Sequence, residues 1–110
     1  MTAPVHVSTH PLIQHQLARL RSVETKPPEF RGLVAGLSRL LFFEATQDIS
    51  LRTVRVQTPL VGMNGSEIAD KVGLVPVLRA GLGMAEAMLQ ALPEATVWHL
   101  GLYRDRKSVV

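Results

Sequence analysis

The sequence contains no cysteine, and only 5% of its residues are aromatic. Without cysteine the chain forms no disulfide, offers no thiolate nucleophile and has no cysteine-based metal site. Nucleic-acid binding normally needs a basic stripe with interleaved aromatic residues. Aromatics are scarce here, and the net charge of +3 comes from residues spread along the chain. We therefore expect no nucleic-acid partner.

The sequence also lacks long apolar runs and clustered metal ligands. None of its apolar stretches approaches the roughly 20 residues that span a bilayer. The N-terminal residues 1–7 lack the basic start and apolar core of a signal peptide. The four histidines form no H-x-x-x-H pair with a neighbouring carboxylate. We therefore expect a soluble, cytoplasmic protein that has no membrane contact and no metal site of its own.

Hydrophobic residues, in contrast, are abundant and make up 46% of the 110 positions. The mean hydropathy of +0.17 is high for so short a soluble chain. A chain of this length forms at most one domain and buries only about two-thirds of its unfolded surface. This composition suits strands that helices cover on both faces, so the predicted fold class is α/β.

The first part of the chain predicts two helices. Thr9 is the expected cap of a helix that ends near Val23, and a second helix is expected over about Pro28–Thr46. Apolar residues of the second helix form a stripe, from which Ser38 is excluded: Phe30, Leu33, Val34, Leu37, Leu40 and Leu41. Glu44 falls on the extension of this stripe. It is either exposed to solvent or paired with a buried arginine, and we favour the pairing.

Residues 51–58 alternate between apolar and polar side chains and are rich in β-branched types, which predicts a strand with one solvated face. The pair Asn64-Gly65 is typical of a tight turn. We therefore expect a hairpin that joins 52–58 to 66–69 through this pair.

The last part of the chain predicts a βαβ unit. Its strands are Leu74–Leu78 and Ala95–Tyr103, and the helix between them is Leu82–Leu92. A crossover of this kind makes the strands parallel and is nearly always right-handed. Both strands are almost continuously apolar, so we expect them to be buried on both faces.

Two arginines follow the two predicted strands of this unit. Arg79 ends the first strand and Arg104 ends the second, so both lie at the carboxyl edge where ligands of α/β sheets bind. Gly81 and Gly83 follow Arg79 at a helix start, where exposed N–H groups attract anions. A dinucleotide fingerprint is excluded because Glu86 stands where its third glycine belongs. The sequence predicts a phosphate or pyrophosphate site, against the alternative of two solvated arginines.

The segment Val75–Met84 resembles the pyrophosphate loop of uracil phosphoribosyltransferases, almost letter for letter. Further matches to this family follow in order along nearly the whole chain: His10-Pro11-Leu12 with His15, Leu17 and Arg21; Phe43-Glu44-Ala45-Thr46-Gln47-Asp48; Thr58-Pro59-Leu60; and Gly101-Leu102-Tyr103-Arg104. Phe43 replaces the tyrosine that the family has at the start of its second motif.

The resemblance implies a pentosyltransferase that joins uracil to 5-phosphoribosyl 1-diphosphate (PRPP), giving UMP and pyrophosphate in pyrimidine salvage. Mg²⁺ accompanies the diphosphate. Carried over by position, Arg79 and Arg104 bind PRPP, chiefly its leaving pyrophosphate, and no catalytic or metal-ligating residue falls in this half of the fold. A homo-oligomer is expected, and a GTP effector, as in some members, is left open.

The chain also departs from the family. It has no Thr-Gly-Gly loop for the ribose phosphate and no uracil-recognition segment, and residues 106–110 differ from the expected acidic continuation. It resembles the N-terminal half of a member, and an early stop or frameshift would explain the ending.

We expect one truncated domain over 1–110, with a helical arm at 1–48, a hairpin region at 49–70 and a βαβ unit at 71–110. One alternative function is an inactive fragment that at most binds phosphate or pairs with a full-length subunit. A free-standing interaction domain is the third hypothesis.

Overall fold

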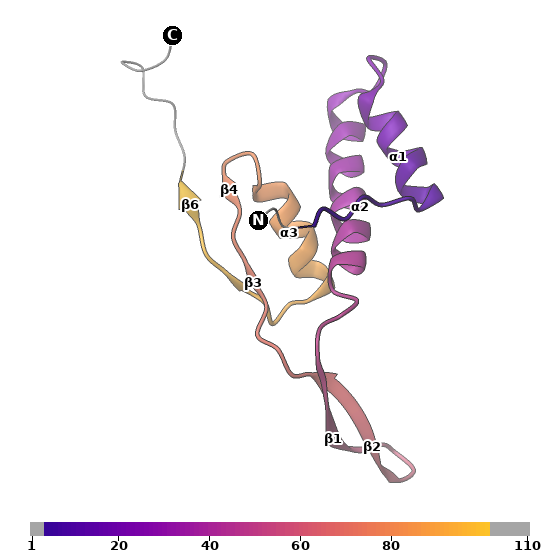
Figure 1. Ribbon diagram of the computed structural model, residues 1–110, viewed down its shortest axis with the longest axis vertical. Coiled ribbons are helices and arrows are strands. Elements are labelled where there is room, and N and C mark those ends of the chain that lie inside the picture. The colour runs from indigo at the N-terminus through magenta and orange to yellow at the C-terminus, as the bar shows by residue number, and fades with distance from the viewer. Residues whose placement is uncertain (1–3, 102–110) are drawn as a thin grey trace.

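The computed structural model describes residues 4–101, with side chains to residue 100. In chain order, its elements are α1 (Pro11–Arg21), α2 (Pro27–Ala45), β1 (Leu51–Gln57), β2 (Gly62–Ile68), β3 (Gly73–Leu74), β4 (Val77–Leu78), α3 (Leu82–Ala91), β5 (Thr96–Val97) and β6 (Leu100–Gly101). This mixed arrangement confirms the α/β class, with two N-terminal helices, a hairpin and a βαβ unit (Figure 1).

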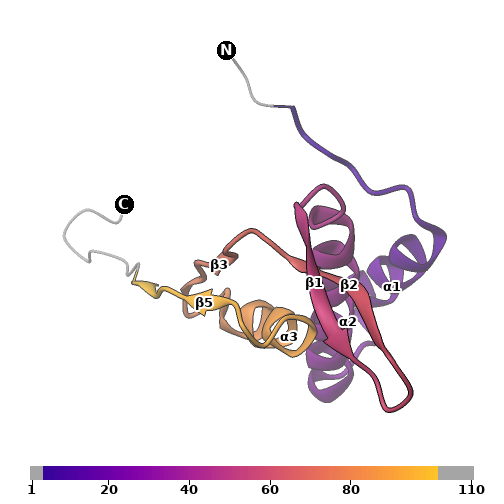
Figure 2. The ribbon, with the colours of Figure 1, turned by 90° about the horizontal axis from the view of Figure 1, so that it is seen from below.

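The three helices lie in a row, with α2 between α1 and α3, and α3 lies between α2 and the short strands (Figures 1 and 2). The small core draws one or two side chains from each of the three helices and one from β3: Ile13, Leu37, Phe42, Leu74, Ala85 and Ala87. The Cα radius of gyration is 18.4 Å, whereas a compact domain of this size has about 13 Å. The described chain is therefore open and elongated.

Helix α1 begins one residue later than predicted, because His10 and not Thr9 is its cap. The Nδ1 atom of His10 accepts a hydrogen bond from the Leu12 amide at 3.1 Å. Pro11 occupies the first helical position, where its missing N–H costs nothing. The helix ends at Arg21, two residues before the expected end at Val23.

Helix α2 matches the predicted range to within one residue at each end, but its buried surface is wider than one stripe. Ser38, which the sequence pattern places off the stripe, is only 1% exposed. Its hydroxyl donates to the carbonyl of Val34 at 2.7 Å, one turn earlier. The helix packs against α1 on one side and α3 on the other. A one-stripe interpretation of α2 was therefore wrong.

The hairpin is present, but its turn is not at Asn64-Gly65. Strands β1 and β2 pair antiparallel from Leu51 opposite Ile68 to Gln57 opposite Gly62, so Asn64-Gly65 lies inside β2. The chain reverses over 58–61, where Thr58 N donates to Val61 O at 3.0 Å. Pro59 follows Thr58 and has the fixed φ that a turn uses at its second position. The hairpin extends away from the helices (Figure 1).

The βαβ unit has parallel strands, as predicted, but each strand is broken into two short pieces. β3 pairs with β5 and β4 pairs with β6. The carbonyls of Val72, Leu74 and Pro76 accept from the amides of Thr96, Trp98 and Leu100 at 3.0, 2.8 and 3.3 Å. Pro76 lies between β3 and β4 and has no N–H to donate, so the series of hydrogen bonds to the neighbouring strand is interrupted there.

The expectation that these strands are buried on both faces was wrong for the described residues. Leu74 is buried, but Val75 is 60% exposed and Trp98 is 66% exposed. Helix α3 covers one side of the strands (Figures 1 and 2). Within residues 4–101 the parallel sheets hold two strands each, so their other side carries apolar residues in contact with solvent.

Candidate functional site

The turn between β4 and α3 is the part of the structure that best fits an anion site. It spans residues 79–81 and is closed by two hydrogen bonds. Gly81 N donates to Val77 O at 2.8 Å, and Leu82 N donates to Arg79 O at 3.2 Å. The peptide bond between Leu78 and Arg79 is cis. The turn directs the chain from the carboxyl end of β4 straight into the helix.

Among the described residues, no side chain caps the N-terminus of α3. Gly81 is the cap residue and has no side chain to bond the first amides, and no acidic residue lies in the first turn. Helix N-termini of this kind carry partial positive charge and uncapped N–H groups, and both favour an anion.

Arg79 is exposed at this turn. Among residues 4–101, the salt bridges are His6–Glu44, Arg19–Glu29 and Arg52–Glu67, and none of them involves Arg79. A guanidinium group is always charged at neutral pH and binds two phosphate oxygens at once. Arg79 therefore sits where the sequence placed it, beside a helix start and at the end of a parallel strand.

Arg104, the second predicted contact, lies outside the described residues. Strand β6 is described as far as Gly101, and its partner β4 runs parallel to it with Leu78 opposite Gly101. The two strands that precede the two arginines therefore end side by side. Their arrangement agrees with the predicted edge, while the position of Arg104 itself stays a prediction.

An apolar cavity of about 300 Å³ lies between the strands and α3, next to the turn. Its lining residues are Leu74, Val75, Pro76, Val77, Gly81, Met84, Ala85 and Met88. None of these side chains is titratable or nucleophilic. The cavity therefore provides space under the turn and no reacting group.

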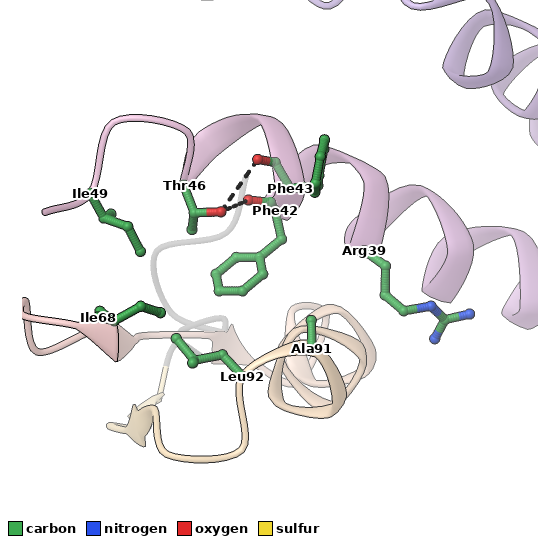
Figure 3. A pocket seen from close by; sticks show the side chains of 8 residues that line it. All are labelled: Arg39, Phe42, Phe43, Thr46, Ile49, Ile68, Ala91 and Leu92. Carbon is green, nitrogen blue, oxygen red and sulfur yellow. Dashed lines mark hydrogen bonds between the residues drawn. The ribbon is translucent and has the colours of Figure 1, made fainter. Parts of the chain in front are cut away.

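A second apolar cavity, of about 240 Å³, lies where the end of α2 meets Ile68 of the hairpin and the end of α3. In Figure 3 the ring of Phe42 faces Leu92 and Ala91, whereas Arg39 extends away from them. The Thr46 hydroxyl donates to the carbonyl of Phe42 at 2.8 Å, within its own helix. This cavity is an imperfectly filled junction between elements and presents no acid, base or nucleophile.

A polar cluster at Glu44 joins the N-terminal segment to α2, and sequence reasoning missed it. Ser8 Oγ donates to one carboxylate oxygen at 2.8 Å, and His6 Nε2 lies 3.1 Å from the other. The Ser8 hydrogen bond, followed by the one from His6, lowers the pKa of Glu44 below 4.5. Glu44 is thus paired, as favoured, but its partners are a serine and a histidine. The expected arginine partner was wrong, because residues 6–8 lie along α2.

Two further findings concern the part of the chain that the structure covers, residues 4–101. No three His, Asp or Glu side chains gather there in a way that holds a metal ion. None of the three helices combines the length and hydrophobicity that crossing a bilayer requires.

Comparison with known proteins identifies the family. Residues 7–110 match the family described as uracil phosphoribosyltransferase. Curated proteins named uracil phosphoribosyltransferase are 52% identical in Roseiflexus sp. (strain RS-1), 50% in Roseiflexus castenholzii and 45% in Staphylococcus epidermidis. These matches cover 97%, 96% and 96% of this chain, but 51%, 50% and 51% of the relatives.

The fold has a solved counterpart. The AQ2163 protein from Aquifex aeolicus superposes with a TM-score of 0.83 at 33% identity, over 94% of this chain and 50% of that chain. The chain thus spans about half the length of the curated relatives and of the solved protein that it matches. The match of residues 7–110 and the identities of 45–52% show that this chain belongs to the uracil phosphoribosyltransferase family, a family of pentosyltransferase enzymes.

Proposed function

We propose that this chain binds PRPP through the turn at 79–81 and serves the uracil phosphoribosyltransferase reaction, in which uracil and PRPP give UMP and pyrophosphate. The observation that carries the proposal is the exposed Arg79 beside the uncapped N-terminus of α3. Both are positive, and both lie at the carboxyl end of β4. The names of the relatives supply uracil as the base.

Arg104 is the second proposed contact to the pyrophosphate. It stands three residues after Gly101 in the sequence, and three residues of extended chain span at most about 10 Å. Since β6 lies beside β4, and neighbouring strands are about 5 Å apart, we propose that both arginines contact one pyrophosphate.

The role of the two arginines follows from where charge develops. In the reaction, the bond between the anomeric carbon of the ribose and the pyrophosphate oxygen breaks, and a bond to the uracil nitrogen forms as that nitrogen loses its proton. Negative charge accumulates on the departing pyrophosphate. Cations already held at that position stabilise the transition state without further reorganisation. No nucleophile or acid–base pair is assigned to the described residues.

Mg²⁺ enters this proposal as part of the substrate, bound to the diphosphate of PRPP. The described residues offer it no ligand set of three His, Asp or Glu side chains, so no step is assigned to an ion held by this chain. The cytoplasmic location, the homo-oligomeric state, a GTP effector and the domain boundaries at 48 and 70 stay predictions from the sequence.

Isothermal titration with pyrophosphate and with PRPP tests the proposal. The substitution Arg79→Ala should weaken binding by about tenfold or more, since a charge-assisted hydrogen bond is worth about 1.5–3 kcal/mol. Arg31→Ala is the matched control, because Arg31 is also exposed and its removal lowers the net charge equally. Equal binding by wild type and Arg79→Ala would contradict the proposal that Arg79 contacts the pyrophosphate.

A non-catalytic role is the second candidate, and the exposed apolar strand residues favour it. Val75, Val77 and Leu100 are 60%, 41% and 48% exposed, and such surfaces pair with other chains. In this role the chain binds phosphate at most, or pairs with a full-length subunit. A radiolabelled-uracil assay on the chain alone tests whether the non-catalytic role can be excluded. We expect the 110-residue chain alone to form no UMP, and turnover would exclude the non-catalytic role.

A further inference from the structure

Gly81 and Gly83 stand two residues apart in the same segment, but their surroundings differ sharply. A Cβ atom on Gly81 would lie 3.0 Å from Val77 N, 3.2 Å from Val77 O and 3.3 Å from Pro76 Cα. A Cβ atom on Gly83 would meet no atom within 4 Å. Within this segment, the crowding is therefore confined to Gly81.

The atoms that crowd Gly81 belong to the backbone and not to a side chain, and this difference decides whether they can make room. A flexible side chain turns aside to make room, but the backbone of β4 is fixed by its pairing with β6. Gly81 has a φ of −84° and a ψ of −2°, a conformation open to every residue type. Space, and not conformational freedom, is what requires glycine at this position.

The close approach of Gly81 also shapes the segment that carries Arg79. Gly81 N donates to Val77 O at 2.8 Å, which brings the end of the turn back onto the strand that begins it. Arg79 lies between these two points, and its carbonyl accepts from Leu82 N at 3.2 Å. Any outward shift of residue 81 therefore moves the backbone from which the Arg79 side chain extends.

We propose that Gly81 is a positioning residue for Arg79: the absence of a side chain lets the turn close on the backbone of Val77, and this closure fixes where the guanidinium group is presented. The proposal rests on the proposed function only in taking Arg79 as the anion contact. The Gly81 amide already donates to Val77 O, so we assign it no contact with the anion.

The test compares Gly81→Ala with Gly32→Ala in the full chain. Gly32 is the matched control because a Cβ atom there meets nothing within 4 Å and the residue lies in α2, far from the turn in sequence. We expect Gly81→Ala to weaken pyrophosphate binding about tenfold, near the lower limit for losing a charge-assisted hydrogen bond. Gly32→Ala should bind as wild type does.

A double-mutant cycle separates positioning from general damage. In the Arg79→Ala background, Gly81→Ala should cause no further loss of pyrophosphate binding, because it acts through the arginine. An additional loss in that background would overturn the proposal, as would unchanged binding by Gly81→Ala in a chain whose binding depends on Arg79.

Amide hydrogen exchange provides a readout that needs neither ligand nor substitution. In the wild-type chain the Gly81 amide should exchange at least about tenfold more slowly than the Gly83 amide, for which the described structure records no acceptor. Gly81→Ala should speed exchange at Leu82, and Gly32→Ala should not. If Arg79→Ala leaves binding unchanged, the proposed function fails, while these exchange rates still decide whether Gly81 closes the turn. Equal rates at Gly81 and Gly83 would contradict the closure.

Discussion

At the scale of single residues, Arg79 and Glu44 are in contrasting situations, since the first is an exposed cation and the second is a carboxylate that is held in place. Arg79 has no acidic partner among the described side chains. Glu44, in contrast, accepts from Ser8 and lies beside His6. The first arrangement leaves a charge available for a ligand, and the second fastens the N-terminal segment to α2. The sequence motif around Glu44 gave no sign of the second role.

The Glu44 contacts predict a pH dependence of stability. The Ser8 hydrogen bond and the nearby His6 and His10 lower the pKa of Glu44 from 4.5, so the folded state favours the ionised carboxylate. Its contribution to the free energy of unfolding is complete above about pH 4.5 and is lost as the pH falls through the lower folded-state pKa. Glu44→Gln should therefore be less stable than wild type at neutral pH, and the difference should vanish on acidification.

Urea unfolding over a pH series measures this effect. Glu24→Gln is the control, since Glu24 is exposed and makes no salt bridge within the part of the chain that the structure describes. If the free energies of unfolding of Glu44→Gln and wild type differ by a constant amount from neutral pH to well below 4.5, the charge of Glu44 does not contribute to stability.

At the scale of helices and strands, the periodic patterns predicted the elements well and the local turn signals did not. The apolar spacing of α2 is repeated over five turns, so its range was predicted to within one residue. Asn64-Gly65 is a frequent turn pair, yet the Thr58-Pro59 segment makes the turn and places the pair inside β2. The burial of Ser38 and the break of the strand at Pro76 were not predicted for a similar reason. The first comes from packing on two sides of α2 and the second from one missing N–H, and neither leaves a periodic pattern in the sequence.

The hairpin provides a direct test of this difference. Thr58→Val removes a hydroxyl that accepts from Val61 N at 3.0 Å, and it should destabilise the hairpin by about 0.5–1.5 kcal/mol. Asn64→Ala should cost less, because the hydrogen bond of the Asn64 side chain among the described residues is a long one, from Arg55 at 3.4 Å. Hydrogen exchange of the β1 and β2 amides reports both effects. A larger effect of Asn64→Ala than of Thr58→Val would indicate that the turn forms at Asn64-Gly65.

Helix packing predicts a second contrast at this scale. Leu37 is 7% exposed, whereas Leu41, on the same helix, is 39% exposed. Leu37→Ala should lower the free energy of unfolding by about 2–5 kcal/mol, and Leu41→Ala by clearly less. Chemical denaturation of both variants checks this, and equal losses would mean that α2 does not pack as described.

At the scale of the whole molecule, an open shape accompanies extensive exposed apolar surface. Val61, Val75 and Trp98 are all more than half exposed, at 61%, 60% and 66%. Paired strands without further neighbours present unsatisfied edges that attract other chains. The sequence indicated the apolar strands correctly, but it did not show that the described chain leaves one of their faces uncovered. That property depends on which other segments pack there.

The open shape predicts self-association. We expect the isolated chain to be marginally folded or self-associating and to bind strongly a dye that reports exposed apolar surface. Sedimentation and thermal unfolding at several protein concentrations test this. A clean monomer with a sharp, concentration-independent transition would show that these residues complete their own core.

The central claim is that the 79–81 turn and the start of α3 form a PRPP site in this member of the uracil phosphoribosyltransferase family. An NMR titration of the labelled chain with PRPP and Mg²⁺ tests it most directly. We predict that the largest amide shifts fall on residues 79–84 and disappear in Arg79→Ala, while the hairpin at 51–68 stays unchanged. Shifts spread over the arginines of α2 and the hairpin, or shifts that persist without Arg79, would contradict it.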